Sequence, residues 1–205
     1  MSRPTLSIHE VFAHQKRDLL SHLLNKLGEN ERALVFIRSR NDLHDIKAEL
    51  NTQDLPLDSI SGSKKPELRE RALRELVSGH IKILLATEAV LRESNLDGIT
   101  HIIQFDTPEL DQDYLARLAS QIDKIITFIS PSDQPRLEKL RTLTELEILT
   151  EIAPDFPYDK YSQQVKSAPI KGHVANKSKS KPLQNKKPKL KNKGPRRKTG
   201  RTRKR

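Results

Sequence analysis

Short apolar runs alternate along the chain with segments in which apolar residues recur every three or four positions. The runs cover residues 33–37, 56–60, 81–86, 101–105 and 124–129. The first of them, ALVFI, is nearly all apolar, which is typical of a strand covered on both faces. Strands that alternate with helices predict a parallel sheet with right-handed crossovers. We expect five to six strands between residues 10 and 152.

Residues at the ends of the helical segments support this prediction. The leucine-rich segment 13–27 is followed by Gly28, a typical helix stop. Ser39 or Asn41 can cap the next helix, and Pro66 fits the first turn of a helix that ends before Gly79. Segment 110–119 is predicted to turn three side chains inward, those of Tyr114, Leu115 and Leu118. A last helix from residue 132 or 133 would carry an apolar stripe at Leu137, Leu140, Leu143, Leu146 and Leu149.

Composition limits the kinds of site that the chain can hold. It has 205 residues, 34% of them hydrophobic, and no cysteine. Disulfides, thiolate metal sites and cysteine nucleophiles are therefore excluded, and the scattered histidines suggest no metal site. No apolar run approaches the roughly 18 residues of a membrane helix, and the first ten residues lack the apolar core of a secretory signal. These features predict a soluble cytoplasmic protein without a membrane partner.

Charge divides the chain into two parts. Residues 160–205 hold 18 of the 38 Lys and Arg and none of the 27 Asp and Glu, so they carry +18 and residues 1–159 carry −7. Such a basic, Pro- and Ser-containing segment cannot bury enough surface to offset the entropy of ordering it. We therefore divide the chain into a lead-in (1–12), a folded domain (13–152), a linker (153–161) and a disordered basic tail (162–205).

Four segments of the predicted domain resemble motifs of one family, the second RecA-like domain of superfamily 2 RNA helicases, in particular the DEAD-box family. ALVFIRSR at residues 33–40 looks like motif IV. SGSKKPELRERAL at 61–73 aligns without gaps to the family's His-Gly-Asp-Leu-Ser-Gln-x-x-Arg-x-x-x-Leu segment. Residues 82–96 look like motif V, and residues 100–117 look like the approach to motif VI. The resemblance implies a three-layer, P-loop NTPase-like α/β fold with helices on both faces of a parallel sheet.

The resemblance also implies a surface for nucleic acid. In the family, the glycine at the position of Gly62, the arginine at Arg69 and the threonine at Thr87 touch the nucleic-acid backbone. A turn amide, a guanidinium and a hydroxyl hold phosphates without reading bases. Pro66 replaces the family's glutamine, so this contact set is incomplete.

Other positions depart from the family pattern. Glu88, Glu93 and Asn95 replace the Asp, Gly and Asp of motif V, and Ser120 stands where the first arginine finger would be. Arginine fingers stabilise charge on a transferring phosphoryl group. The sequence also contains no GxxxxGK[ST] loop and no Asp-Glu-Ala-Asp box. We therefore expect no catalytic residue, no bound cofactor and no ATP hydrolysis by this chain alone.

Simpler structural roles compete with these assignments. Arg69 could pair with Glu67 or Glu70 as an ordinary surface residue, and Thr87 could cap the following turn. Arg92 and Arg117, the remnants of a nucleotide-binding edge, could instead pair with nearby carboxylates such as Asp106 or Asp113. His101 is interpreted as a partly buried strand residue.

The basic tail is the other predicted nucleic-acid contact. A segment of +18 condenses on an accessible polyanion with strong salt dependence and without sequence preference. Its densest blocks supply the expected contacts: Lys186, Lys187, Lys189, Arg196, Arg197, Lys198, Arg201 and Arg203.

Three functions follow from these observations. The first is RNA binding by a degenerate helicase C-terminal domain, acting mainly through its tail, with ribosome assembly or RNA metabolism as the setting and a ribosomal particle as a partner. The second is half of a split ATP-dependent RNA helicase that requires a separate N-terminal RecA-like partner. The third is a protein-interaction module whose acidic domain contacts a partner while the tail localises it.

Overall fold

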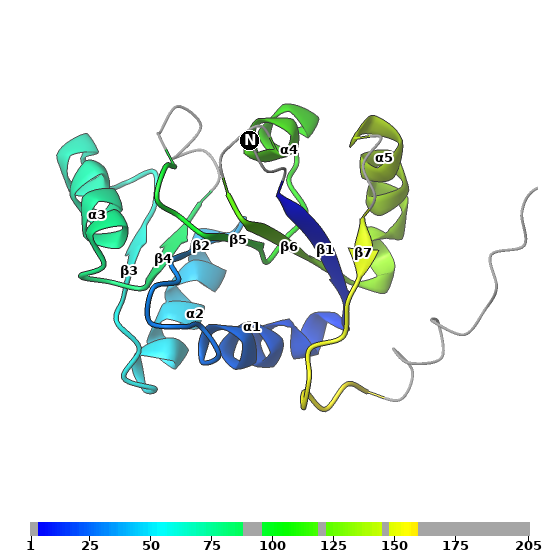
Figure 1. Ribbon diagram of the computed structural model, residues 1–205, viewed down its shortest axis with the longest axis horizontal. Coiled ribbons are helices and arrows are strands. Elements are labelled where there is room, and N and C mark those ends of the chain that lie inside the picture. The colour runs from blue at the N-terminus through cyan, green and yellow to red at the C-terminus, as the bar shows by residue number, and fades with distance from the viewer. Residues whose placement is uncertain (1–3, 88–95, 119–121, 145–147, 160–205) are drawn as a thin grey trace, which may run out of the picture. The chain divides into compact units, whose positions relative to one another are not determined.

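The computed structural model describes residues 4–87, 96–118, 122–144 and 148–159. Within these ranges the chain forms one sheet of seven parallel strands, in the order β3-β4-β2-β5-β6-β1-β7 (Figure 1). The strands are β1 Thr5–Glu10, β2 Ala33–Phe36, β3 Leu57–Ile60, β4 Ile83–Ala86, β5 His101–Gln104, β6 Lys124–Ile129 and β7 Leu149–Thr150.

Helices cover both faces of the sheet. A short 3-10 turn, η1 Ala13–Gln15, precedes α1 Lys16–Leu24, and a second one, η3 Pro131–Asp133, precedes α5 Gln134–Thr144. The others are α2 Arg40–Asn51, α3 Pro66–Ser78 and α4 Asp111–Leu118. α1 and α2 lie on one face and α3, α4 and α5 on the other (Figure 1). The predicted three-layer α/β architecture is confirmed.

Local chemistry explains where the helices begin and end. The Ser39 hydroxyl accepts a hydrogen bond from the Asp42 amide at 3.3 Å and caps α2. Pro66 occupies the first turn of α3, where a missing N–H is tolerated. Gly79 ends α3 with a left-handed φ of 83°, which glycine adopts without a steric penalty. The Ser39, Pro66 and Gly79 predictions are confirmed.

The amino-terminal segment belongs to the sheet. Residues 1–12 were predicted as a lead-in, but β1 pairs in parallel with β6 from Thr5–Lys124 to Glu10–Ile129. That boundary is wrong because two polar side chains of the strand, Ser7 and His9, are buried and interrupt its apolar pattern. β1 lies between β6 and β7, so the domain depends on a strand from each end of the described chain.

Two leucines were placed wrongly from helical spacing. Leu137 and Leu140 are buried as predicted, but Leu149 does not continue their stripe. It lies in the two-residue strand β7 beside Ser7 and is 43% exposed. Leu115 is also exposed, so spacing alone overestimated the buried face of α4. The side chains of Leu143 and Leu146 lie outside the described residues.

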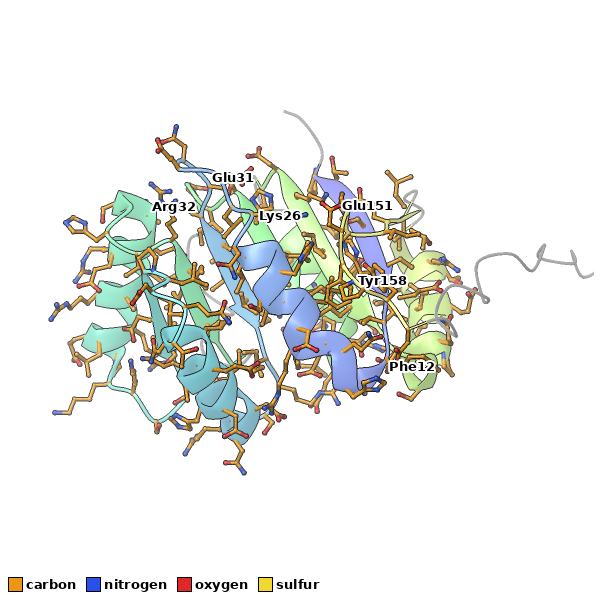
Figure 2. All side chains as sticks on the ribbon, turned by 90° about the horizontal axis from the view of Figure 1, so that it is seen from below. Phe12, Lys26, Glu31, Arg32, Glu151 and Tyr158 are labelled. Atoms are coloured by element: carbon orange, nitrogen blue, oxygen red, sulfur yellow. The ribbon has the colours of Figure 1, made fainter. Side chains whose placement is uncertain are left out.

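The segment 151–159, hereafter the C-terminal segment, packs on the domain. It contains three buried side chains, Ala153, Phe156 and Tyr158. The Tyr158 hydroxyl accepts a hydrogen bond from the Ala153 amide at 3.0 Å and lies 3.1 Å from Nδ1 of His9. Figure 2 shows Tyr158 close to α1. Residues 153–161 are therefore not a free linker over their described part, because their aromatic rings complete the core beneath α1.

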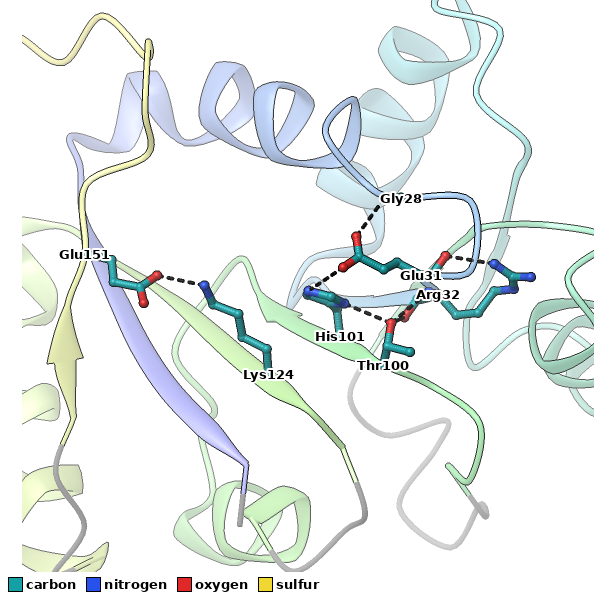
Figure 3. Close-up of polar contacts among 7 residues, drawn as sticks. All are labelled: Gly28, Glu31, Arg32, Thr100, His101, Lys124 and Glu151. Carbon is teal, nitrogen blue, oxygen red and sulfur yellow. Dashed lines mark hydrogen bonds and ion pairs between the residues drawn. The ribbon is translucent and has the colours of Figure 1, made fainter. Parts of the chain in front are cut away.

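The amino ends of the strands carry a separate set of polar contacts (Figure 3). Lys124 at the start of β6 pairs with Glu151 at 2.8 Å. Glu31 accepts a hydrogen bond from the Gly28 amide at 2.7 Å and lies 3.9 Å from Nε2 of His101. Burial lowers the pKa of His101, an effect that Glu31 partly opposes. His101 is a partly buried strand residue, as predicted.

Candidate functional site

The candidate site lies at the carboxyl ends of four adjacent strands. Ile60 of β3 pairs with Ala86 of β4, Ala86 pairs with Phe36 of β2, and Phe36 pairs with Gln104 of β5. The loops that follow these residues therefore leave the sheet side by side. In open parallel sheets, ligands bind outside this edge. Gly62 and Thr87 lie in the loops after β3 and β4, and α3, which follows the first loop, carries Arg69.

The turn at Gly62 is open to solvent. Its geometry is maintained by neighbouring residues, since the Lys64 amide donates to the Ser61 carbonyl at 2.9 Å and the Ser61 and Ser63 hydroxyls lie 3.1 Å apart. Gly62 has no positive φ, and a Cβ built on it would meet nothing within 4 Å. The fold itself therefore does not require glycine here. A glycine in open space is suited to the close approach of another molecule's backbone.

Arg69 lies in the first turns of α3, where its amide donates to the Lys65 carbonyl at 3.2 Å. Its Nε atom is buried and has no hydrogen-bond partner among the described residues. The proposed pairing with Glu67 or Glu70 is not found within that part of the chain, where Glu70 lies 3.6 Å from Arg74 instead. Because Nε is enclosed, a partner arriving from solvent would have to meet the other nitrogens of the Arg69 guanidinium.

Thr87 is held beside this turn by the backbone. Its amide donates to the Ile60 carbonyl at 3.2 Å, two residues before Gly62. Its side chain is half-buried. The turn that Thr87 was expected to cap begins at residue 88, outside the described residues, so the capping role stays a prediction. The structure thus brings Gly62 and the Thr87 backbone to neighbouring strand ends.

A partly buried carboxylate, that of Asp58, fixes the base of the Gly62 turn. Lys64 contacts the Ser59 carbonyl and lies 3.6 Å from Asp58, which also accepts a hydrogen bond from Lys47 at 2.9 Å. Burial tends to raise the pKa of Asp58, but the hydrogen bonds and positive charges of the two lysines lower it overall. Asp58 therefore remains charged and anchors Lys64 at this loop.

Arg38 links the ends of β2 and β5, a contact that spacing did not reveal. Its amide donates to Asp106 at 3.0 Å and its guanidinium donates to the Thr107 carbonyl at 2.8 Å. Its Nε lies 3.6 Å from Glu109. Arg38 is half exposed, and Glu109 partly balances its positive charge at this edge. The only sequence signal for it was its position in the motif IV-like segment.

Arg117 has a structural position inside the domain. It lies in α4, is 5% exposed, and its guanidinium carbon is 3.7 Å from the centre of the Phe36 ring. Stacking of this kind combines cation–π attraction with burial of the flat guanidinium faces.

Several predicted residues lie outside the described part of the chain. These are Arg92 of the motif V-like loop and all the tail contacts: Lys186, Lys187, Lys189, Arg196, Arg197, Lys198, Arg201 and Arg203. Among the residues that the structure does describe, no group of three His, Asp or Glu side chains could hold a metal ion. Over the same ranges, no helix is long and apolar enough to cross a membrane.

Comparison with known proteins gives the family. Residues 15–119, about half of the chain, match the model of the helicase conserved C-terminal domain. The chain belongs to this family. The helicase C-terminal domain begins, by this match, at η1 and includes the Gly62 turn, Arg69, Thr87 and Arg117. The predicted resemblance is thereby confirmed.

The relatives include several RNA helicases. The DEAD-box ATP-dependent RNA helicase CshA of Bacillus licheniformis is 29% identical over 141 residues, which are 66% of this chain and 29% of CshA. ATP-dependent RNA helicase vasa of Drosophila melanogaster is 30% identical over 112 residues, or 55% of this chain and 17% of vasa. The chain thus spans about three tenths or less of the length of these relatives.

Solved structures show the same fold at lower identity. The E. coli DEAD-box protein SrmB, crystallised with the regulator of ribonuclease activity RraA, matches with a TM-score of 0.66 at 23% identity, over 78% of this chain and 99% of that one. S. cerevisiae Dbp5 bound to RNA and ADP BeF3 also gives 0.66, at 16% identity, over 80% of this chain and 44% of that one. The RecA-like fold is therefore established for this chain.

Proposed function

We propose that this helicase C-terminal domain binds the sugar-phosphate backbone of RNA at the carboxyl edge of its sheet, and that the basic tail supplies most of the electrostatic affinity. The observation that carries the proposal is the open Gly62 turn at the carboxyl edge of the sheet, in the loop that leads into α3 and Arg69. An approachable backbone and a guanidinium group suit a phosphate and carry no base information.

We propose further that the chain hydrolyses no ATP by itself. Ser120 stands at the position of the first arginine finger, and the 205 residues contain no GxxxxGK[ST] loop. Arg117 stacks on Phe36 and is only 5% exposed, so little of its surface is open to a nucleotide. An ATPase assay of the purified chain with and without single-stranded RNA tests this proposal. RNA-stimulated phosphate release from the chain alone would contradict it.

The edge is tested by RNA binding of matched arginine variants. Replacing Arg69 by Gln in a chain ending at residue 161 should weaken binding to a single-stranded RNA about fivefold, since a charge-assisted hydrogen bond contributes about 1 kcal/mol here. The slope of log K against log salt should fall by about 0.7 for one lost phosphate contact. Arg74→Gln, on the same helix and exposed, is the control. Equal effects of both variants would refute a specific role of Arg69.

The tail is tested by comparing the full chain with the chain ending at residue 161. The full chain should bind RNA more tightly and with a much steeper salt dependence, because up to 17 positive charges in residues 162–205 release counterions. Each of the two chains should bind RNAs of unrelated sequence with similar affinity. Unchanged affinity after removal of residues 162–205 would refute the tail's part of the proposal.

As a biological setting we propose cytoplasmic RNA metabolism, including ribosome assembly, with a ribosomal particle as one partner. Sequence-independent phosphate binding suits a large structured RNA. Co-sedimentation of the chain with ribosomal particles, lost at high salt, is the expected result. A chain that stays in the ribosome-free fractions at low salt would contradict this setting.

A further inference from the structure

A groove lies on the face opposite α3, away from the proposed RNA contacts. It has a volume of about 380 Å³ and is bordered by α1, by the end of α2 and by the C-terminal segment. This volume is at the lower end of the range for ligand pockets, which suits one long side chain better than a folded element. Its wall includes Asp18, Glu49 and the aromatic ring of Phe156.

Two carboxylates at the groove make it negative. Asp18 and Glu49 are exposed, and neither forms an ion pair with another described residue. The neighbouring carboxylates differ in this respect, since Asp42 and Asp45 lie 3.2 Å and 3.6 Å from Arg17. The groove therefore lacks a positive charge to balance Asp18 and Glu49. It would attract a cation and repel a phosphate group.

The other walls of the groove are fixed by internal hydrogen bonds. Ser21 and Asn25 both donate to the Gln53 side-chain oxygen at 2.8 Å, which holds α1 against the end of α2. His22 lies 2.7 Å from the Pro154 carbonyl and packs edge-on against Phe156, with ring centres 5.5 Å apart. The cavity is therefore part of the folded structure, and a ligand would not have to create it.

We propose that this groove binds an arginine side chain presented by a basic segment of a partner protein. A planar guanidinium can bond two carboxylates through separate N–H groups and lie against an aromatic ring, which an ammonium does less well. The negative charge of Asp18 and Glu49 argues for a basic peptide over RNA as the occupant. This site is independent of the proposed RNA edge, and either proposal can fail without the other.

The test uses the full ¹⁵N-labelled chain and a short probe, acetyl-Gly-Arg-Gly-Arg-Gly-amide. Saturable changes in the amide resonances of Asp18, Glu49 and Gln53 are expected with this peptide. A peptide with glutamate in place of arginine should cause none, and a lysine version should bind at least about threefold more weakly. Equal binding of the lysine peptide, or the same changes with a decamer of uridine, would overturn the proposal.

Two double variants with the same change in net charge distinguish a specific effect of the groove carboxylates from a general effect of charge. Asp18→Asn with Glu49→Gln should lower the affinity for the arginine peptide about tenfold or more, the expected effect of losing two charge-assisted contacts. Glu67→Gln with Glu70→Gln makes the same charge change on α3 and should alter the affinity less than about twofold. All four side chains are exposed, and circular dichroism checks that both variants remain folded. Equal losses in the two variants would refute a specific groove.

Discussion

The hydroxyl of Tyr158 provides the sharpest test of how the C-terminal segment is held. Tyr158→Phe removes one oxygen and keeps the ring that packs 4.8 Å from the centre of Phe156. The change leaves the Ala153 amide, in a residue only 2% exposed, without its hydrogen-bond acceptor. It also removes the neighbour of His9 Nδ1 at 3.1 Å. We therefore expect the variant to be less stable. Because the ring stays in place, the loss does not include the cost of a large cavity.

The magnitude follows from the unsatisfied amide. A buried donor that loses its partner costs about 1–3 kcal/mol, so we expect the free energy of unfolding to fall by about 2 kcal/mol. For a domain of this size, such a change lowers the melting temperature by about 4–8 °C. Burial raises the pKa of Tyr158, so the hydroxyl stays protonated over the neutral range. The loss should therefore be constant between about pH 7 and pH 8.

Urea unfolding followed by circular dichroism measures the effect on the full chain. A double-mutant cycle with His9→Gln isolates the contribution of the His9–Tyr158 contact from other effects of each change. Positive coupling of about 0.5 kcal/mol or more is expected, the lower end for residues in direct contact. A Tyr158→Phe variant within about 0.3 kcal/mol of the parent would refute the idea that this hydroxyl anchors the segment.

Three further predictions concern local stability and are measured by the same unfolding experiment. Burial lowers the pKa of His101, so stability should fall as the pH drops below about 6.5. His101→Gln should reduce that fall. Ser39→Ala should cost about 1 kcal/mol because α2 loses its cap. Gly79→Ala should cost more than about 1 kcal/mol, since φ is 83° and a Cβ would meet the Arg32 guanidinium. Parent-like stability of the Ser39 or Gly79 variant would contradict the assigned role.

The parts of the fold that follow from short-range patterns were predictable. β2 and β4 are continuous apolar runs, and Pro66 and Gly79 mark the ends of α3 through backbone chemistry alone. β1 was missed because its burial depends on partners far along the chain. Ser7 and His9 face a buried environment that β6 and the C-terminal segment create. The residues next to them in the sequence give no sign of this burial.

The candidate site, like the fold, has residues that short-range patterns predicted and features that only three-dimensional packing determines. Gly62, Arg69 and Thr87 were found by comparing residues with family motifs, because each sits at a fixed distance from a strand end. The openness at Gly62 and the stacking of Arg117 on Phe36 depend on three-dimensional packing and could not be predicted. The groove beside Phe156 was missed for a related reason. Residues 153–161 had been treated as a linker, although their proline-rich sequence brings an aromatic ring back to α1.

The position of β1 has a consequence for synthesis on the ribosome. Residues 5–10 are made before their neighbours in the sheet, Lys124–Ile129 and Leu149–Thr150. At about 5–20 residues per second, roughly 6–24 s pass before the first partner strand is translated. During that interval Leu6 and Ile8, both buried in the finished domain, have no sheet to join. The nascent chain therefore carries an unpaired apolar strand until its far end emerges, and we expect chaperones to bind it there.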